Sequence, residues 1–229
     1  MFTQTDELSA LRESPFGRAL GQDLIARLLA VGSVRDFSKG HIFFNQGEKV
    51  GHVVIMLQGR VSLTASRSDG EQAVVDIISE GEVFPLAAVV LGQPAPVGAE
   101  ALTNGRAVWV EDGVLQQMLK DVPPFKTAIM SQLGRQYHDM VLQNKALKLQ
   151  NTNQRLAHFL LMHTDMDDGA VEVRLLDERR MLARRLGMTP ESLSRAIAQL
   201  VGCGVEFSQQ RVLIRDVDRL RQFCGLERV

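Results

Sequence analysis

The sequence holds few of the residues that build cross-linked, metal-rich or membrane-spanning proteins. Only two of its 229 residues are cysteines, Cys203 and Cys224, which excludes a disulfide scaffold and favours the reducing cytoplasm as the compartment. The two cysteines fit no metal-ligand spacing, so we expect no bound metal. No apolar run approaches the roughly 20 residues that cross a membrane, and the N-terminus has acidic residues where a signal peptide is apolar. We therefore expect no membrane partner, and the apolar fraction of 45% supports substantial cores.

The formal net charge of −1 conceals an uneven distribution along the chain. Residues 170–229 hold eleven arginines and eight acidic residues, a net charge of +3, which leaves −4 for residues 1–169. Five of these arginines and a single glutamate fall within residues 179–195. A basic segment confined to one unit is typical of phosphate contact in nucleic-acid-binding proteins. The alternative interpretation is a solvated helix face, which explains most runs of charge.

The segment 177–200 predicts two short helices joined by a tight turn. Gly187 should end the first helix, because glycine readily takes positive φ at a helix C-terminus. Thr189 should cap the second helix, and Pro190 should occupy its first position, where a missing N–H costs nothing. The second helix has an apolar face of Leu193, Ile197 and Leu200 and a polar face of Glu191, Ser194 and Arg195. This is the layout of a helix-turn-helix, whose second helix enters the DNA major groove.

Residues 34–110 have the pattern of an all-β domain. Short β-rich runs alternate with glycines at spacings close to the roughly 8–12 residues of a sandwich or barrel, and Ser68–Gly70 is a good hairpin turn. The expected strands are His41–Phe44, Val53–Leu57, Val61–Ala65, Val74–Ile78 and Ala107–Val110. One or two helices should precede them at residues 8–30, and a short helix should follow at residues 114–120.

Pro123 and Pro124 open a long predicted helix that continues to about Gln150. Its apolar residues alternate at spacings of three and four, which is the a/d seam of a coiled coil and indicates a parallel partner helix. The seam consists of Met130, Leu133, Tyr137, Met140, Asn144 and Leu147. Asn144 is its single polar a position, and a lone buried asparagine fixes the register of such pairs. The alternative is a helix that packs only on its own domain.

Beyond this helix the pattern predicts a second, winged domain. Asn151–Asn153 weakens helicity and predicts a hinge. The elements expected after it are a helix at Arg155–His163, a loop at Asp165–Gly169, a strand at Val171–Leu175, the helix-turn-helix, wing strands at Glu206–Ser208 and Val212–Arg215, and a closing helix at Asp216–Phe223.

This order of elements resembles the Crp/Fnr family of bacterial transcription regulators over nearly the whole chain. The matching motifs are Phe37–Gly40, Phe44–Glu48, Gln58–Val61, Asp69–Gly70, Gly81–Glu82, Arg155–Ala157, Phe159–Leu161, Leu182–Ala183, Leu186–Thr189 and Pro190–Arg195. The resemblance implies an α+β protein: a cyclic-nucleotide-binding-type β-roll (jelly roll) sensor at 1–121, a dimerisation helix at 122–150 and a winged helix-turn-helix at 151–229. It also implies a homodimer on double-stranded DNA, contact with RNA polymerase and no enzymatic activity.

The resemblance carries over to individual recognition residues. Glu191 matches the family's acidic reader, which accepts from a cytosine N4 amino group, and Arg195 matches its arginine, which donates to guanine O6 and N7. Ser194 matches the serine of the Fnr/Dnr-like branch, and Pro190 stands where the Crp-like branch has another base-reading arginine. A palindrome with TTGAT half-sites is therefore implied. Residues in phosphate-contact positions are Thr189, Ser192 and Arg185. Each of these residues could instead be an ordinary helix-surface residue.

The sensor departs from the pattern of the relatives that bind cAMP. That pattern has a Gly-Glu pair and an Arg-Ser pair around the cyclic phosphate, whereas Pro85-Leu86 and Ala95-Pro96 stand here. A buried phosphate would lack its arginine, so cAMP is not the expected ligand. An iron–sulfur cluster held by cysteines of the sensor domain is excluded as well, because no cysteine precedes Cys203. Cys203 is either a redox-reactive thiol or a small packed residue.

Two interpretations of the sensor stay open. In the first, Phe84, Leu86 and Val89 line an apolar pocket beside Glu82 that takes haem or another apolar ligand, as the resemblance to haem-dependent relatives implies. His138, on the long helix, is then the best placed of five histidines to bind haem iron, although none lies in a haem motif. In the second, the pocket is filled core and DNA binding is constitutive.

Two other functions compete with a DNA-binding regulator. An enzyme centred on the β-roll would need clustered histidine and carboxylate ligands, and His41 and His52 do not supply that pattern. A cyclic-nucleotide-binding module could act as a cAMP-responsive regulator or through a protein partner, but it requires the phosphate-binding pairs that the chain lacks.

Overall fold

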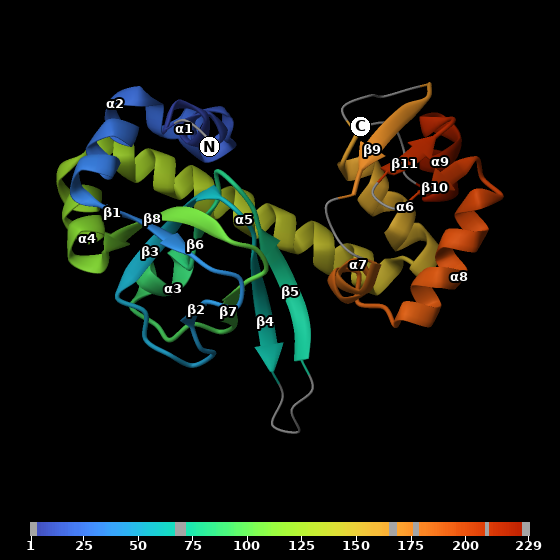
Figure 1. Cartoon of the computed structure of the whole chain (residues 1–229), viewed down its shortest axis with the longest axis horizontal. Helices are drawn as coiled ribbons and strands as arrows, with labels where there is room; N and C mark the ends of the chain where they lie inside the picture. Colours follow the sequence, from blue (N-terminus) through green and yellow to red (C-terminus); the bar gives the residue numbers. More distant parts are fainter. Residues whose placement is uncertain (1–3, 67–71, 165–168, 176–178, 209–210, 226–229) are drawn as a thin grey trace. The chain divides into compact units, whose positions relative to one another are not determined.

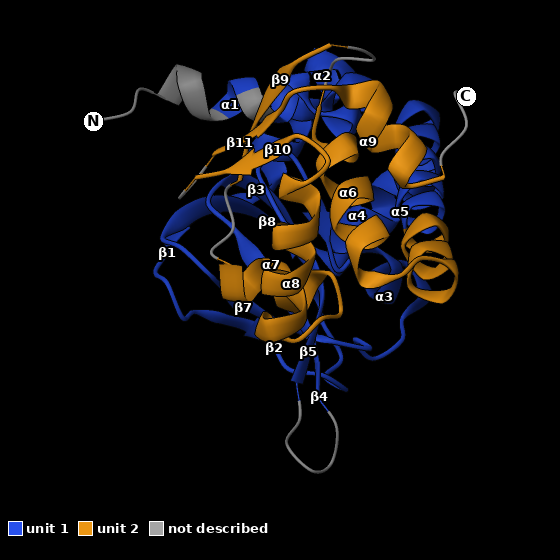
Figure 2. Cartoon of the chain, turned by 90° about the vertical axis from the view of Figure 1, so that its right-hand side faces the viewer, with its two compact units in different colours: residues 1–139 blue, residues 140–229 orange. Residues whose placement is uncertain are grey.

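A computed structural model describes residues 4–66, 72–164, 169–175, 179–208 and 211–225 of the chain. The chain forms two compact units, residues 1–139 and 140–229, and the division falls within one long helix (Figure 2). Three predicted features lie outside the described residues: the hairpin turn Ser68–Gly70, most of the loop at 165–169 and the tip of the wing at 209–210. No described helix is both long enough and apolar enough to cross a membrane.

The first unit opens with two helices, as predicted, and continues as a set of short strands (Figure 1). Its elements are α1 (Gln4–Glu13), α2 (Pro15–Val31), β1 (Ser33–Phe37), β2 (Ile42–Phe44), β3 (His52–Gln58), β4 (Val61–Ser66), β5 (Gln72–Ile78), β6 (Val83–Phe84), α3 (Leu86–Leu91), β7 (Gly98–Ala101), β8 (Gly105–Glu111) and α4 (Asp112–Asp121). The long helix α5 (Pro123–Leu149) follows from the predicted proline. All five predicted strands are present.

The strands form two four-stranded antiparallel sheets, ordered β1-β8-β3-β6 and β2-β7-β4-β5. One apolar core joins them, since Phe44 and Val61 from one sheet are buried in the same cluster as Val54 and Val108 from the other. Helices α1, α3 and α4 contact β3, which explains why its residues 53–57 are buried in succession rather than alternately. The predicted β-roll is confirmed.

Three strands of the roll have no clear signal in the sequence. Four of the five β1 residues are exposed, β6 has two residues, and β7 is Gly98-Ala-Glu-Ala101, which has low intrinsic β propensity. Each strand forms because a neighbour supplies its hydrogen bonds: β1 pairs with β8, β6 with β3, and β7 lies between β2 and β4. Tertiary pairing, rather than local preference, determines these elements.

The second unit contains the winged helix-turn-helix that the sequence predicts. Its elements are α6 (Thr152–Met162), β9 (Val171–Arg174), α7 (Arg179–Arg185), α8 (Pro190–Val201), β10 (Val205–Phe207), β11 (Arg211–Ile214) and α9 (Val217–Phe223). The strands form one antiparallel sheet, ordered β10-β11-β9. A separate apolar core includes Leu156 and Leu160 of α6, Leu182 of α7, and Leu193 and Leu200 of α8.

The predicted hinge at 151–153 has the structure of a well-capped helix start. The Asn151 side chain accepts from the backbone N–H of Gln154 at 3.0 Å, and the Gln154 side chain accepts from the N–H of Asn151 at 3.1 Å. Gln150 adds a side-chain hydrogen bond of 3.2 Å to Nδ1 of His158. Because these bonds satisfy the polar groups that the break between α5 and α6 leaves free, the break is locally ordered.

We predict that Gly105→Ala destabilises the first unit by about 1–3 kcal/mol, because the sheet has no room for a side chain there. A Cβ at Gly105 would overlap the carbonyl oxygen of Gln58 and the ring of Phe37. Gly113→Ala is the control: its Cβ meets no atom within 4 Å, and alanine should raise helix stability by about 0.5 kcal/mol. Urea unfolding followed by circular dichroism measures the stability of both variants. Equal unfolding midpoints for Gly105→Ala and Gly113→Ala would contradict the packing argument.

Candidate nucleic-acid interface

Backbone hydrogen bonds close the turn between α7 and α8. The N–H of Gly187 donates to the carbonyl of Arg184 at 3.1 Å, and that of Met188 donates to the carbonyl of Ala183 at 2.9 Å. Gly187 has a φ of 61°, a left-handed conformation that a side chain would strain. Leu147, near the end of α5, lies beside the turn, 3.2 Å from where a Cβ of Gly187 would be. The backbone hydrogen bonds and the conformation of Gly187 thus define the turn.

The second helix starts as the sequence predicts. The Thr189 side chain accepts from the N–H of Ser192 at 3.2 Å, and Pro190 occupies the first turn. Leu193, Ala196 and Leu200 are buried, so the opposite face is turned outward. The exposed residues of that face are Glu191, Ser194, Arg195 and Ala198. The three predicted base-reading side chains therefore share one exposed face.

Hydrogen bonds and charge organise the polar residues of this face. Arg195 donates to Oγ of Ser192 at 3.3 Å, which links it to the N-cap of the helix. The pKa of Glu191 lies below its ordinary value, first because its own backbone N–H donates to the carboxylate, then because of the Thr189 side chain and the charge of Arg195. Glu191 is therefore ionised at neutral pH and only accepts hydrogen bonds, as the reading of a cytosine amino group requires.

The arginines of α7 differ in exposure. Arg185, the predicted phosphate contact, is partly buried, and its guanidinium lies 5.3 Å from the centre of the Phe159 ring. Arg179, Arg180 and Arg184 are exposed. These three belong to the basic segment 179–195, and their place in the first helix of the motif, which crosses the DNA backbone, indicates phosphate contact. Thr189 is exposed and Ser192 is half-buried at the N-terminus of α8.

The residues predicted to line an apolar effector pocket are packed core. Phe84, Leu86 and Val89 are each at most 2% exposed and belong to the cluster that joins the two sheets. Glu82 accepts from the N–H of Ser79 at 2.6 Å, which closes a turn. His138 is exposed on α5. These residues do not fit haem, since haem binding needs an open apolar slot with the iron ligand turned into it.

The segment where cAMP-binding relatives hold their arginine serves a structural role here. The N–H of Ala95 donates to the carbonyl of Glu48 at 2.8 Å, and the N–H of Gly47 donates to the carbonyl of Ala95 at 2.8 Å. Ala95 is buried and presents only a methyl group. Pro85 precedes α3 and Leu86 is core, so neither supplies the carboxylate of the missing pair.

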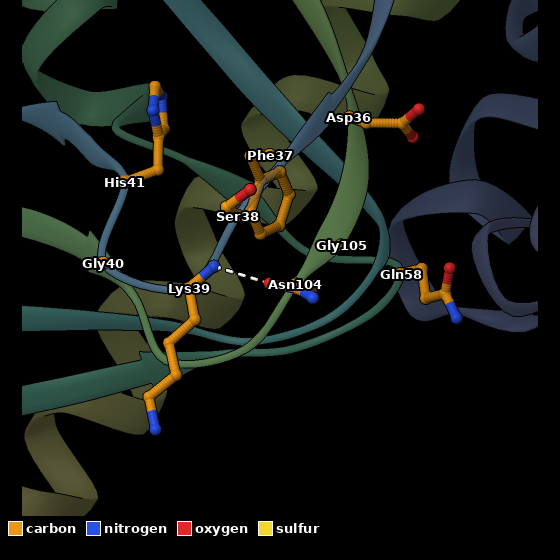
Figure 3. Close-up of a pocket in the computed structure, with 9 residues that line it drawn as sticks. All are labelled: Asp36, Phe37, Ser38, Lys39, Gly40, His41, Gln58, Asn104 and Gly105. Atoms are coloured by element: carbon orange, nitrogen blue, oxygen red, sulfur yellow. Dashed lines mark hydrogen bonds between the residues drawn. The ribbon is translucent and has the colours of Figure 1, made fainter.

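A shallow surface hollow lies at the end of β1 and the start of β8 (Figure 3). The N–H of Lys39 donates to Oδ1 of Asn104 at 2.8 Å across its floor. The side chains of Lys39, His41 and Gln58 point in different directions and do not converge (Figure 3). Among the described residues, no three His, Cys, Asp or Glu side chains group as a metal site would require.

The predicted seam of α5 forms an apolar face that is largely exposed in the single chain. Tyr137 is 65% and Met140 is 56% exposed, and Met130 and Leu147 are similar. Asn144 is exposed at the expected position between them. Leu133 differs, because it is partly buried against the core of the first unit. Five of the six residues of the predicted seam are thus exposed in the single chain.

Comparisons with known proteins agree with this arrangement. The protein-family model for the cyclic nucleotide-binding domain matches residues 34–122 of this chain. The protein-family model for the Crp-like helix-turn-helix domain matches residues 154–223. A solved structure from Ruegeria pomeroyi, whose assignment as a cyclic nucleotide binding protein is provisional, is 31% identical. It aligns over 99% of this chain and 100% of its own, with a TM-score of 0.65. The chain belongs to the Crp/Fnr family of transcription regulators.

More distant Crp/Fnr relatives carry regulator names. The nitrogen fixation regulation protein FixK of Azorhizobium caulinodans is 26% identical over 227 residues, which cover 92% of this chain and 88% of that protein. A CRP-like cAMP-activated global transcriptional regulator of Mycobacterium tuberculosis is 24% identical over 190 residues, 81% of this chain and 85% of that protein. This Crp/Fnr chain therefore spans most of the length of both.

We predict that only one of the two cysteines reacts in the folded protein. Cys224 is buried and its Sγ lies 3.7 Å from the carbonyl of Gln154, and burial raises the pKa of its thiol to about 12. At pH 8 it is therefore protonated and unreactive, because the thiolate is the nucleophile. Cys203 is partly exposed. A thiol reagent should label one site per chain, and Cys203→Ser should abolish labelling; rapid labelling of that variant would contradict the assignment.

Proposed function

We propose that this chain is a homodimeric, sequence-specific DNA-binding transcription regulator that recognises a TTGAT-type palindrome. The observation that carries the proposal is the exposed face of α8, which brings Glu191, Ser194 and Arg195 together above a buried apolar face. A capped helix of 12 residues with a basic helix packed against it suits the major groove. RNA polymerase is the expected protein partner.

Base reading is assigned to residues of α8. Arg195 can donate two hydrogen bonds to guanine O6 and N7, and ionised Glu191 can accept from cytosine N4. Pro190 at the start of the helix offers no donor there, which agrees with a half-site of the Fnr/Dnr-like type rather than TGTGA. Thr189 and Ser192, at the N-terminus of α8, would donate to phosphates and position the helix without specifying sequence.

Dimerisation is assigned to the seam of α5. An exposed row of Met130, Tyr137, Met140 and Leu147 is costly in water and matches the a and d positions of a parallel pair. A second copy of the chain is the occupant that presents the same spacing, and Asn144 would fix the register. Two recognition helices could then enter successive major grooves, about 34 Å apart.

The signal is proposed to be something other than cAMP, or DNA binding is constitutive. The buried methyl group of Ala95 and the packed core around Phe84 support this. A cAMP-responsive regulator is the alternative function, since one relative is a cAMP-activated regulator and the domain model is that of cyclic nucleotide binding. Calorimetric titration with cAMP separates the two, because detectable binding would support the alternative and none is expected.

Substitutions in the seam should control dimerisation. We predict that Met140→Glu raises the dimer dissociation constant at least about tenfold, because it places a charge in each copy of an apolar interface. Leu149→Glu is the matched control: Leu149 is 74% exposed and lies off the seam. Sedimentation at several protein concentrations measures the constant. Equal dimer dissociation constants for Met140→Glu and Leu149→Glu would show that α5 does not dimerise through this face.

Fluorescence anisotropy on a TTGAT/ATCAA palindrome and a scrambled duplex tests recognition. We predict that Arg195→Ala loses roughly 1–3 kcal/mol on the palindrome and little on the scrambled duplex, so that specificity relaxes. Arg185→Ala is the comparison variant and should weaken both duplexes alike. If Arg195→Ala keeps the wild-type preference, the base-reading assignment is wrong. If the wild type binds neither duplex at physiological salt, the palindrome is wrong or an effector is required.

A further inference from the structure

Three of the methionines that the structure describes have strongly exposed side chains. Met130 is 64% exposed, Met140 is 56% exposed and Met162 is 62% exposed, whereas the other described methionines are buried or partly buried. Met130 and Met140 belong to the proposed dimer seam of α5, and Met162 is the last residue of α6. The single chain therefore offers three thioethers of similar exposure, of which only two lie on the face that a second copy would cover.

The seam around these two methionines leaves room for a partner helix to come close. Gly134 lies on the same face of α5, four residues after Met130 and three before Tyr137. It is exposed, and a Cβ there would meet no described atom within 4 Å. Glycine weakens a helix interior, and packing among the described residues does not require it here. Close approach of a second α5 would use the space that the missing side chain leaves.

Oxidation changes what the two thioethers contribute to such an interface. Hydrogen peroxide transfers one oxygen atom to the methionine sulfur: the O–O bond breaks, an S–O bond forms, the sulfur loses two electrons and water leaves. The product, methionine sulfoxide, is polar where the thioether was apolar. Burial of this oxygen in an apolar seam removes its hydrogen bonds to water, which is unfavourable. Each oxidised position would carry this cost in both protomers of a homodimer.

We propose that Met130 and Met140 are a modification site, at which a peroxide inactivates the regulator by preventing its dimerisation. The inference rests on the proposed function, and it supplies a signal that requires no ligand pocket in the β-roll. The dimer shields both sulfurs, so the oxidant reaches them in the free chains with which the dimer is in equilibrium. Oxidised chains re-form the seam only weakly, and dimers are lost by mass action.

The rate of oxidation at each methionine tests the shielding. Hydrogen peroxide is added to the Cys203→Ser variant, which lacks the partly exposed thiol, and peptide mass spectrometry follows Met130, Met140 and Met162. Oxidation of Met130 and Met140 should slow as the protein concentration rises above the dimer dissociation constant. Met162 should oxidise at the same rate throughout. Rates that do not depend on concentration at any of the three positions would overturn the inference.

Substitutions separate oxidation of the seam from damage elsewhere. Oxidised protein should have a dimer dissociation constant at least about tenfold higher than untreated protein and should bind the palindrome more weakly. Met130→Gln with Met140→Gln places polar side chains of similar length in the seam and should reproduce this loss without oxidant. Met130→Leu with Met140→Leu keeps the seam apolar without a thioether, so its dimer dissociation constant should be the same before and after peroxide. Met162→Leu is the matched control and should give no protection.

The outcomes distinguish this inference from the proposed function. If the untreated protein dimerises and full oxidation of Met130 and Met140 leaves the dimer dissociation constant unchanged, the modification site is wrong and the regulator stands. If the double leucine variant loses dimers after peroxide as its parent does, another residue is responsible and the inference also fails. If the untreated protein does not dimerise, or binds no duplex from a panel of half-sites, the proposed function fails first and the inference fails with it. Circular dichroism before and after treatment checks that each sample stays folded.

Discussion

The left-handed turn at Gly187 constrains everything that the second unit can present to DNA. Leu182 and Ala183 of α7 and Leu193, Ala196 and Leu200 of α8 share one core, so the two helices meet at a fixed angle only if the chain reverses within a few residues. A residue with positive φ makes that reversal without strain, and the Thr189 cap then starts α8 at a defined residue. Because the helical start is fixed, the rotation of α8 is fixed, and its polar residues face outward as a set.

The long helix α5 is built into the β-roll of the first unit. The first half of α5 is part of the core of the first unit, with Phe125, Ala128 and Ile129 buried. Gln136 donates from Nε2 to the carbonyl of Val83 at 3.0 Å, which ties α5 to β6. That strand directly precedes the segment where related proteins bind a cyclic phosphate. A change of conformation there would therefore reach the helix both through this hydrogen bond and through the shared apolar core.

The sequence predicts the parts of the fold whose signal is local. Capping and turn residues such as Thr189 and Gly187 predict the helix-turn-helix. The spacing of three and four residues along α5 predicts the apolar seam. Strands β1, β6 and β7 were not predictable, because their stability comes from pairing with distant segments. The same limit applies to the site: the α8 residues follow from helical periodicity, whereas the partial burial of Arg185 against the Phe159 ring depends on how α6 and α7 pack. The apolar cluster around Phe84 shows a further limit, since hydrophobic residues near a motif look the same in sequence whether they line a cavity or fill a core.

If α5 dimerises through its exposed face as proposed, the amount of active protein is a nonlinear function of the amount synthesised. If most chains are monomers, the concentration of dimers rises with the square of the total concentration, so a modest change in synthesis or degradation gives a larger change in DNA occupancy. In such a dimer Tyr137 and Met140, which are exposed in the single chain, would tune this threshold, because the apolar area removed from water contributes to the dimer dissociation constant. A Crp/Fnr chain with a filled sensor core could in this way respond to gene dosage without binding a small molecule.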